Sequence, residues 1–266
     1  MIWIISGTQD GREIGARLAD WAAAQPDAGR PQIFMTVVSQ YGKILAAHEG
    51  ITIEVGRFTK DDMLREICEK HVTVILDCSH PYAAVVSETA RDASREAGIA
   101  YVRYERPGVA LPVYDRLHVV QTEEEAAALA GALGESVLLT TGSKTLPVFA
   151  RAPALAGKTL WARVLPLSQV VAQCESLGLT AKHIIAMQGP FSYDMNRAMI
   201  RHCAADVLVT KNSGLVGGSD TKLKAAMDEG IHVIVIDRPK ASLAGAPVFS
   251  SEEQVLKYME EHHEFY

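Results

Sequence analysis

The stretch Trp3–Gly11, WIISGTQDG, decides how the rest of the chain is interpreted. A short apolar run leads directly into small residues and a glycine, which is typical of a buried β-strand followed by a tight turn. The stretch Leu138–Leu146, LLTTGSKTL, has the same form. The sequence therefore predicts a strand and a turn of the same kind at two distant places in the chain.

Two further features recur in the same order after each of these turns. Val72–Tyr82 and Ala205–Leu215 each place a strand before a polar turn that contains serine. Ala97–Pro107 and Glu229–Pro239 each run from Gly-Ile through a strand to Arg-Pro. Any α/β chain shows some self-similarity, because strand, turn and helix recur, but the shared order of three features favours a duplication.

Strand patterns alternate with helical patterns along the chain, which predicts parallel sheets covered on both faces. We expect an α/β fold of two Rossmann-like halves with mainly parallel sheets and a cleft between them. The expected domains are residues 1–133 and 134–266, with a final helix at Glu252–His262 that could pack on either half. Strands are expected at Ile2–Ile5, Gln32–Val38, Val72–Leu76, Ile99–Tyr104, Val137–Thr140, Thr159–Arg163, His183–Ala186, Val207–Thr210 and His232–Asp237, and the first helices at Glu13–Ala24, Asp61–Lys70 and Ala83–Ala97, with Thr59 as an N-cap.

Composition limits the classes of function. The 266 residues are 48% hydrophobic with a net charge of −6 and no block of Lys or Arg, which supports a packed core and argues against a nucleic-acid partner. The four cysteines are scattered without a C-x-x-C pair, which favours a reducing compartment. We find no membrane-spanning run, no signal peptide and no metal-ligand spacing, and adjacent His262 and His263 would point apart on a helix. A cytoplasmic protein is expected.

In open parallel sheets, ligands bind outside the carboxyl ends of the strands, and each polar turn quoted above follows a strand. The first turn runs from Ser6 to Gly15 and leads into a helix, whose N-terminus presents free N–H groups to anions. Its spacing is not G-x-G-x-x-G, because Glu13 stands where the last glycine would be. We favour a nucleotide site over a purely structural turn.

A glycine-rich stretch, Val209–Lys222, follows a later strand. Its glycines could expose successive N–H groups as an anion nest, and nearby lysines supply positive charge. It is not a Walker A loop, and the alternative is a flexible surface connection. The glycines are Gly214, Gly217 and Gly218, and the lysines are Lys211, Lys222 and Lys224.

Two other strand ends carry polar residues. Ser79 and His80 follow one strand, and Pro81 is expected to begin the next helix. His80 could donate a proton or bind a ligand, but without a G-x-S-x-G motif a serine hydrolase is not expected. Gln188–Ser192 ends another strand with a proline, a serine that could cap a helix, and Phe191, for which core packing is an equal alternative.

Taken together, these turns resemble the precorrin-6A reductase family of cobalamin biosynthesis, including its cobalt-precorrin-6A form. The departures are small: Gln9-Asp10 and DCSHPY replace the Glu-Ala and Asp-Ala-Thr-His-Pro-Phe expected of the family. The resemblance covers almost the whole chain and is carried by GTQDGREIGARLA, DCSHPYAAVVSETA, YVRYERP, LLTTGSKTLPVF, RVLP, IIAMQGPFS, LVTKNSGLVGGSDTKLKAA and VIDRP.

The resemblance implies an NADPH-dependent reductase that delivers hydride to one double bond of a ring-contracted tetrapyrrole, with the site between two Rossmann-like halves. Cationic side chains would meet the acetate and propionate groups of the macrocycle. It leaves the proton donor open, and other enzymes of the cobalamin pathway open as partners.

The candidate residues follow from matching this sequence to the family. His80 and Lys211 are the catalytic candidates. The substrate candidates are Arg106, Lys144, Arg163 and Gln188. The cofactor candidates are Gly7, Thr8, Gly11, Arg12, Ser39, Ser79, Ser213, Gly214, Gly217 and Gly218.

Two alternatives remain at this point. A nucleotide-sugar glycosyltransferase also has two Rossmann-like halves, and it would be stabilised by a nucleoside diphosphate and not by NADPH. A non-enzymatic, two-lobed small-molecule sensor would turn over no cofactor.

Overall fold

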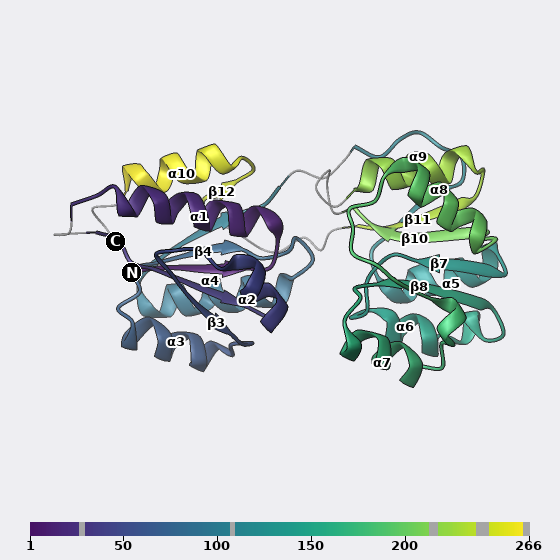
Figure 1. The fold of residues 1–266 in the computed structure, drawn as a ribbon, viewed down its shortest axis with the longest axis horizontal. Coiled ribbons are helices and arrows are strands. Elements are labelled where there is room, and N and C mark those ends of the chain that lie inside the picture. Colours follow the sequence, from purple (N-terminus) through teal and green to yellow (C-terminus); the bar gives the residue numbers. More distant parts are fainter. Residues whose placement is uncertain (27–29, 107–109, 213–217, 238–244, 263–266) are drawn as a thin grey trace. The chain divides into compact units, whose positions relative to one another are not determined.

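The computed structural model describes residues 1–26, 30–106, 110–212, 218–237 and 245–262. The chain divides into two compact units, each with its own sheet (Figure 1). Unit 1 comprises Met1–Pro107 together with Pro239–Tyr266, and unit 2 comprises Gly108–Arg238.

Unit 1 contains a six-stranded sheet in the order β12-β5-β4-β1-β2-β3, in which every pair is parallel. Its three central strands, β4, β1 and β2, are mostly apolar and wholly buried, as expected where helices cover both faces. Because the strands are parallel, all their carboxyl ends lie along one edge. The strands are β1 (Ile2–Ser6), β2 (Ile33–Val37), β3 (Ile51–Val55), β4 (Val74–Cys78), β5 (Ala100–Tyr104) and β12 (Val248–Phe249).

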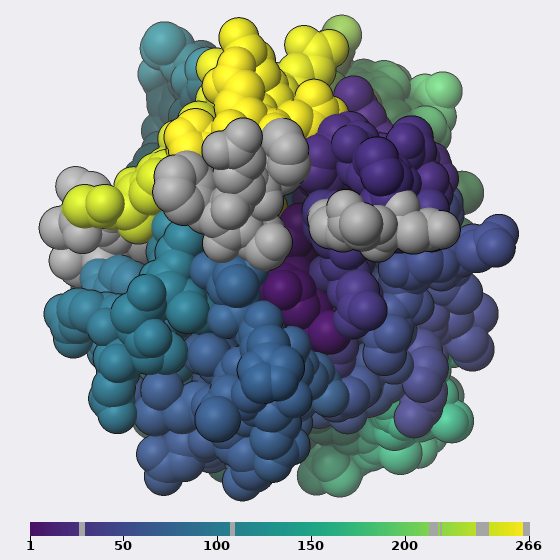
Figure 2. Space-filling view, turned by 90° about the vertical axis from the view of Figure 1, so that its left-hand side faces the viewer, coloured from purple at the N-terminus to yellow at the C-terminus, as the bar shows by residue number. Residues whose placement is uncertain are grey.

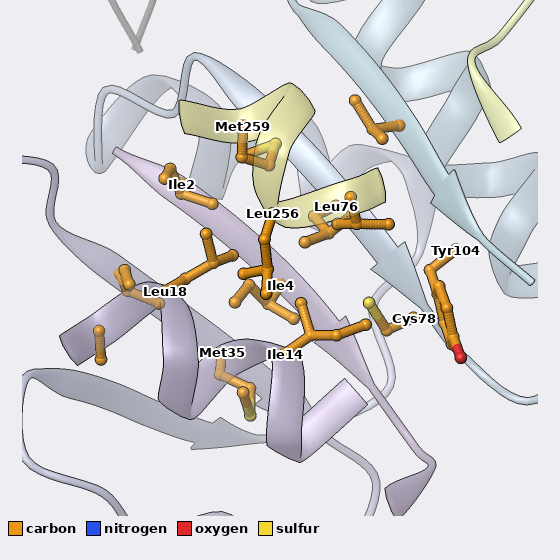
Figure 3. Packing of buried hydrophobic residues seen from close by; sticks show 14 of the residues in the cluster. Ile2, Ile4, Ile14, Leu18, Met35, Leu76, Cys78, Tyr104, Leu256 and Met259 are labelled. Carbon is orange, nitrogen blue, oxygen red and sulfur yellow. The ribbon is translucent and has the colours of Figure 1, made fainter. Parts of the chain in front are cut away.

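Helices cover both faces of this sheet. On one face, Ile14 and Leu18 of α1 and Leu256 of α10 pack on Ile4 of β1 (Figure 3). On the other face, Met63 of α3 and residues of α4 pack around the strands. The helices of unit 1 are α1 (Gln9–Ala23), α2 (Gln40–Ala46), α3 (Lys60–Glu69), α4 (Ala84–Ala97) and α10 (Glu252–Glu261).

The last helix, α10, belongs to unit 1 although it is distant from it in sequence. Val255 and Met259 are fully buried in the same cluster as Ile2. α10 lies beside α1 on the surface, the yellow segment next to purple in Figure 2. Of the two positions that the sequence left open for this helix, the structure has the one on the N-terminal half.

Unit 2 contains a second six-stranded sheet, in the order β6-β11-β10-β7-β8-β9, and its pairs are also all parallel. Helices α8 and α9 cover one face, and α5, α6 and α7 lie on the other (Figure 1). The strands are β6 (Leu117–Val120), β7 (Ser136–Leu139), β8 (Thr159–Val164), β9 (Ile184–Ala186), β10 (Val207–Lys211) and β11 (His232–Ile236), and the helices are α5 (Glu123–Leu133), α6 (Leu146–Arg151), α7 (Ser168–Ser176), α8 (Tyr193–His202) and α9 (Ser219–Asp228), with single 3-10 turns at Pro153–Leu155 and Ala181–His183.

The two sheets have the same topology, which confirms the prediction of two similar α/β halves with parallel sheets. The order β3-β2-β1-β4-β5 in unit 1 corresponds to β9-β8-β7-β10-β11 in unit 2. The three recurring features of the sequence fall on the equivalent pairs β1 and β7, β4 and β10, and β5 and β11.

The boundary between the units differs from the expected division at residues 133 and 134. The physical reason is strand pairing: β6 pairs with β11 of unit 2, and β12 pairs with β5 of unit 1. Each sheet therefore receives its sixth strand, and the helix after it, from beyond an Arg-Pro pair. The chain passes between the units twice, after Pro107 and after Arg238.

Most expected elements occur within a few residues of their predicted bounds, and Thr59 caps α3 as predicted. One expectation at a helix start was wrong: α4 begins at Ala84, and Pro81 lies in the turn before it. Within the described residues, no helix is long and apolar enough to cross a membrane.

Candidate functional site

The turn after β1 is fastened to the end of β4. Thr8 caps α1: its Oγ1 accepts a hydrogen bond from the Gly11 N–H at 3.0 Å and donates to the carbonyl of Cys78 at 3.1 Å. The Arg12 guanidinium donates to the Thr8 carbonyl at 3.1 Å. The N-terminus of α1 is thus held at the carboxyl edge of the sheet, with Gly7 exposed there.

The two glycines of this turn, Gly7 and Gly11, differ in whether packing requires a glycine at that position. A Cβ at Gly11 would lie 2.8 Å from the Cβ of Cys78 and 3.2 Å from its carbonyl oxygen, so only glycine lets α1 approach β4 this closely. A Cβ at Gly7 would find its nearest atom, the His80 nitrogen, at an ordinary 3.8 Å. Gly7 and His80 therefore lie side by side on the edge, and no packing constraint requires glycine at position 7.

An ion pair crosses the start of α1. Arg106 donates through Nη1 to Oδ2 of Asp10 at 3.0 Å, and both side chains are buried. Asp10 lies in the first turn of α1, where a carboxylate would repel a bound phosphate unless it were neutralised. The sequence made Arg106 a substrate candidate, but its guanidinium is bound to Asp10, in the turn that contains Gly7, Thr8 and Gly11.

Ser79 is part of a buried network of polar side chains. No pattern in the sequence indicated its partners in this network. Its Oγ accepts from Arg103 at 2.9 Å and lies 3.3 Å from Oγ of Ser87. Arg103 also pairs with Asp77 at 2.8 Å. Tyr101 donates to the second oxygen of Asp77 at 2.8 Å, and burial, with the adjacent carboxylate, raises the pKa of this tyrosine. The Ser79 hydroxyl is therefore committed to the protein interior.

His80 and Ser39 lie at the same edge as Gly7, at the ends of the strands that flank β1. His80 is half-buried, and its Nδ1 accepts from the Tyr82 N–H at 3.3 Å. Ser39 caps α2, with its Oγ accepting from the Gly42 N–H at 3.0 Å. Because β2 neighbours β1, Ser39 and Gly7 follow adjacent strands at this edge.

The equivalent edge of unit 2 carries several cations. Lys211, at the end of β10, pairs with Glu123 at 3.0 Å. Lys144, in the turn after β7, and Gln188, after β9, are both exposed. The Gly-rich loop is only partly described: Gly218 is buried, has φ of 64° and precedes α9, whereas Ser213, Gly214 and Gly217 lie outside the described residues.

Arg163 is buried at the end of β8. It donates to Oδ1 of Asn196 at 2.7 Å, and its guanidinium lies 4.4 Å from the centroid of the Phe191 ring. Phe191 is thus both packed against the core of unit 2 and in contact with this cation. Ser192 caps α8 as expected, accepting from the Met195 N–H at 3.2 Å.

Sequence reasoning counted Lys222 only as a charge near the glycines, but it lies inside unit 2. Its side chain is 5% exposed and donates to Oγ1 of Thr210 at 2.9 Å. The signal that could have found it is helical spacing, because Lys222 shares a stripe of α9 with Ala225 and Ala226, which are fully buried.

The structure gathers the candidates into two sets, one at the carboxyl edge of each sheet. In the part of the chain that is described, no group of three or more His, Cys, Asp or Glu could hold a metal ion. Unit 1 carries Gly7, Thr8, Gly11, Arg12, Ser39, Ser79, His80 and Arg106, and unit 2 carries Lys144, Arg163, Gln188, Lys211 and Gly218.

Known proteins are similar to this chain over nearly its whole length. A cobalt-precorrin-6A reductase of Priestia megaterium is 38% identical over 257 residues, covering 96% of each chain, and one of Salmonella typhimurium is 35% identical over 252 residues, covering 94% of this chain and 92% of the relative. The solved structure of CobK precorrin-6A reductase has the same fold, with a TM-score of 0.73 at 22% identity over 98% of this chain and 96% of that one. The model of the precorrin-6x reductase CbiJ/CobK family matches residues 1–260, and the chain belongs to that family.

Proposed function

We propose that this chain reduces one double bond of precorrin-6A, or of its cobalt-containing form, in cobalamin biosynthesis, with NADPH as the reductant. The observation that carries the proposal is the nearly full-length likeness to curated cobalt-precorrin-6A reductases. A cytoplasmic location is part of the same proposal. The location is supported by the four cysteines, which are free.

The edge of unit 1 fits a dinucleotide. Gly7 is exposed beside the N-terminus of α1, a helix of 15 residues, so a phosphate group could approach the backbone there without meeting a side chain at that position. The carboxylate of Asp10, the one acidic group in that first turn, is neutralised by Arg106. When bound, NADPH would supply the hydride, while Thr8, Gly11 and Arg12 keep the turn in place.

Arg106 therefore acts, in this proposal, by removing the repulsion between Asp10 and a phosphate. Ser39 would approach the adenosine ribose or its 2′-phosphate from the end of β2. His80, whose backbone nitrogen lies beside Gly7, carries a titratable side chain that could bind or protonate a ligand at this edge. Lys211 would be the catalytic residue at the edge of unit 2, where its ion pair with Glu123 holds its side chain in position.

Thermal unfolding with and without NADPH tests the cofactor. We expect NADPH to raise the melting temperature, since a ligand at a hundredfold excess over its Kd stabilises the native state by about 2.7 kcal/mol. We also expect NADPH oxidation only when the tetrapyrrole is present. If neither NADPH nor NADP⁺ shifted the melting temperature at millimolar concentration, the cofactor assignment would be wrong.

A matched pair of variants at Ser39 tests the phosphate contact. Ser39→Asp and Ser39→Asn both keep a good N-cap for α2, but only Ser39→Asp places a negative charge near the 2′-phosphate. We expect Ser39→Asp to weaken NADPH binding roughly tenfold relative to NADH, about 1.4 kcal/mol, and Ser39→Asn to leave the preference unchanged. Equal preferences in both variants would place the 2′-phosphate elsewhere.

A further inference from the structure

Unit 2 contains two buried cations for which the described residues provide no counter-charge. Arg163 is 8% exposed and Lys222 is 5% exposed. A buried charge is costly unless an opposite charge accompanies it. In unit 1 the buried arginines obey this rule, because Arg103 pairs with Asp77 and Arg106 with Asp10. No carboxylate in the described part of the chain forms an ion pair with Arg163 or Lys222.

The two cations approach the same face of the sheet from different elements. Trp161, two residues before Arg163, and Leu208, two residues before Thr210, pack in the cluster beneath α8 and α9, so Arg163 and Thr210 also face these helices. Lys222 reaches from α9 to Thr210, at the end of β10. Both cations therefore lie at the carboxyl edge, where ligands of parallel sheets bind.

The turn before α8 contacts Arg163 and also the residue next to Lys222. Its Phe191 covers the guanidinium of Arg163, and its carbonyl accepts from Nδ2 of Asn196 at 3.2 Å. The same carbonyl accepts from the hydroxyl of Thr221, the neighbour of Lys222, at 3.1 Å. These contacts hold Arg163 and the first turn of α9 against one short segment.

The electrostatics at this place are positive. Burial, together with the charge of Arg163, lowers the pKa of Lys222 to about 7. Burial lowers the pKa of Arg163 to about 10. Among the described residues, the thiol of Cys203 also interacts with Arg163, but burial raises its pKa to about 11, so it carries no negative charge at neutral pH. The N-terminus of α9 adds a partial positive charge.

We propose that Arg163 and Lys222 form an oxyanion-binding site that accepts a carboxylate or phosphate group. The described hydrogen bonds of Arg163 leave from Nη1, so Nε and Nη2 are available to a ligand oxygen. A bound anion restores the positive charge of Lys222, so binding is accompanied by proton uptake near neutral pH. Under the proposed function, on which the choice of ligand rests, the anion is a side-chain carboxylate of the tetrapyrrole or a phosphate of the nucleotide.

The test compares Lys222→Met and Arg163→Met with the wild type, and uses Lys182→Met, an exposed lysine of the same unit, as the control. Sulfate is the first probe. We expect sulfate to raise the melting temperature of the wild type and of Lys182→Met by more than that of either site variant, in which only the general stabilising effect of this salt remains. Because each site variant removes an uncompensated buried charge, we expect its ligand-free melting temperature to be no lower than that of the wild type.

Two further probes separate the sources of the anion. Uroporphyrin presents acetate and propionate groups, and NADP⁺ presents phosphates. We expect the affinity for one of them to fall about tenfold or more in both site variants, which is the loss expected from removing a charged hydrogen-bond donor. A loss for uroporphyrin alone assigns the site to the substrate, and a loss for NADP⁺ alone assigns it to the cofactor.

The pH dependence of stability provides a second readout. The pKa of Lys222 is about 7 in the folded chain against an ordinary 10.5, so between these pH values the unfolded chain binds more protons. We expect the ligand-free wild type to gain stability as the pH rises from about 7 towards 10.5, and Lys222→Met to lack this part of the gain.

Some outcomes would overturn the site and leave the proposed function intact. If Lys222→Met and Arg163→Met unfolded at lower temperature than the wild type and kept its affinity for all three probes, the two side chains would be structural. If sulfate stabilisation depended on both cations while NADPH had no effect on the wild type, the site would hold and the proposed reductase activity would fail.

Discussion

Gly11 is the residue at which α1 comes nearest to β4, and the tolerance of this contact can be tested. Gly11→Ala would gain up to about 1 kcal/mol in helix propensity, but its methyl group would stand 2.8 Å from the Cβ of Cys78. Both atoms are close to the backbone and cannot swing away. We therefore expect the free energy of unfolding, measured in urea, to fall by about 1–3 kcal/mol.

Gly7→Ala is the matched control for this effect. Its Cβ would meet no atom nearer than the His80 nitrogen at 3.8 Å, so stability should change by about 0.5 kcal/mol or less. Under the proposed function, the same methyl group would obstruct the approach of a phosphate, so NADPH affinity should fall. An unstable Gly7→Ala, or a fully stable Gly11→Ala, would contradict this assignment of roles.

At the scale of single elements, α3 shows how local chemistry sets a helix start. The Thr59 hydroxyl accepts from the Asp62 N–H at 3.2 Å, while the Asp62 carboxylate accepts from the Thr59 N–H at 3.0 Å, which completes a capping box. We expect Thr59→Ala to lower the free energy of unfolding by about 1 kcal/mol and Thr59→Ser to preserve it.

The same cap has a signature in pH. Hydrogen bonds from the hydroxyl and the N–H of Thr59, and then from Arg65, lower the pKa of Asp62 from 3.8 to about 2. Because the folded pKa is the lower one, the contribution of this carboxylate to stability is present above about pH 4 and is lost as the pH falls towards 2. An NMR titration should therefore report a higher pKa for Asp62 in Thr59→Ala than in the wild type, and an unchanged pKa would argue against the hydroxyl contact.

At the scale of the whole molecule, each unit contains a strand and a helix that directly follow the other unit in the sequence. Unit 2 obtains β6 and α5 from the segment that follows β5, and unit 1 obtains β12 and α10 from the segment that follows β11. Each unit is complete only with its segment, because α10 contributes Val255, Leu256 and Met259 to the core of unit 1.

This arrangement predicts which fragments fold. Residues 108–238, expressed alone, contain a complete sheet and should unfold cooperatively, as followed by circular dichroism. Residues 134–266 lack β6 and carry α10 without the surface it covers, so they should aggregate or unfold without cooperativity. Cooperative unfolding of 134–266 together with failure of 108–238 would contradict the observed division.

The sequence by itself determined the inner strands, the repeat of the two halves and the turns at the strand ends. Apolar runs and capping residues are local signals, because each depends only on residues that are close together in the chain. It did not reveal β3, β6 and β12, which are all edge strands and are partly exposed, and of which β12 has only two residues. Only the tertiary structure decided the domain boundary, the pairing of Asp10 with Arg106, and the burial of Lys222 against Thr210. These depend on segments far apart in the chain, and the free energy that brings such segments together comes from packing between them, which no local pattern encodes.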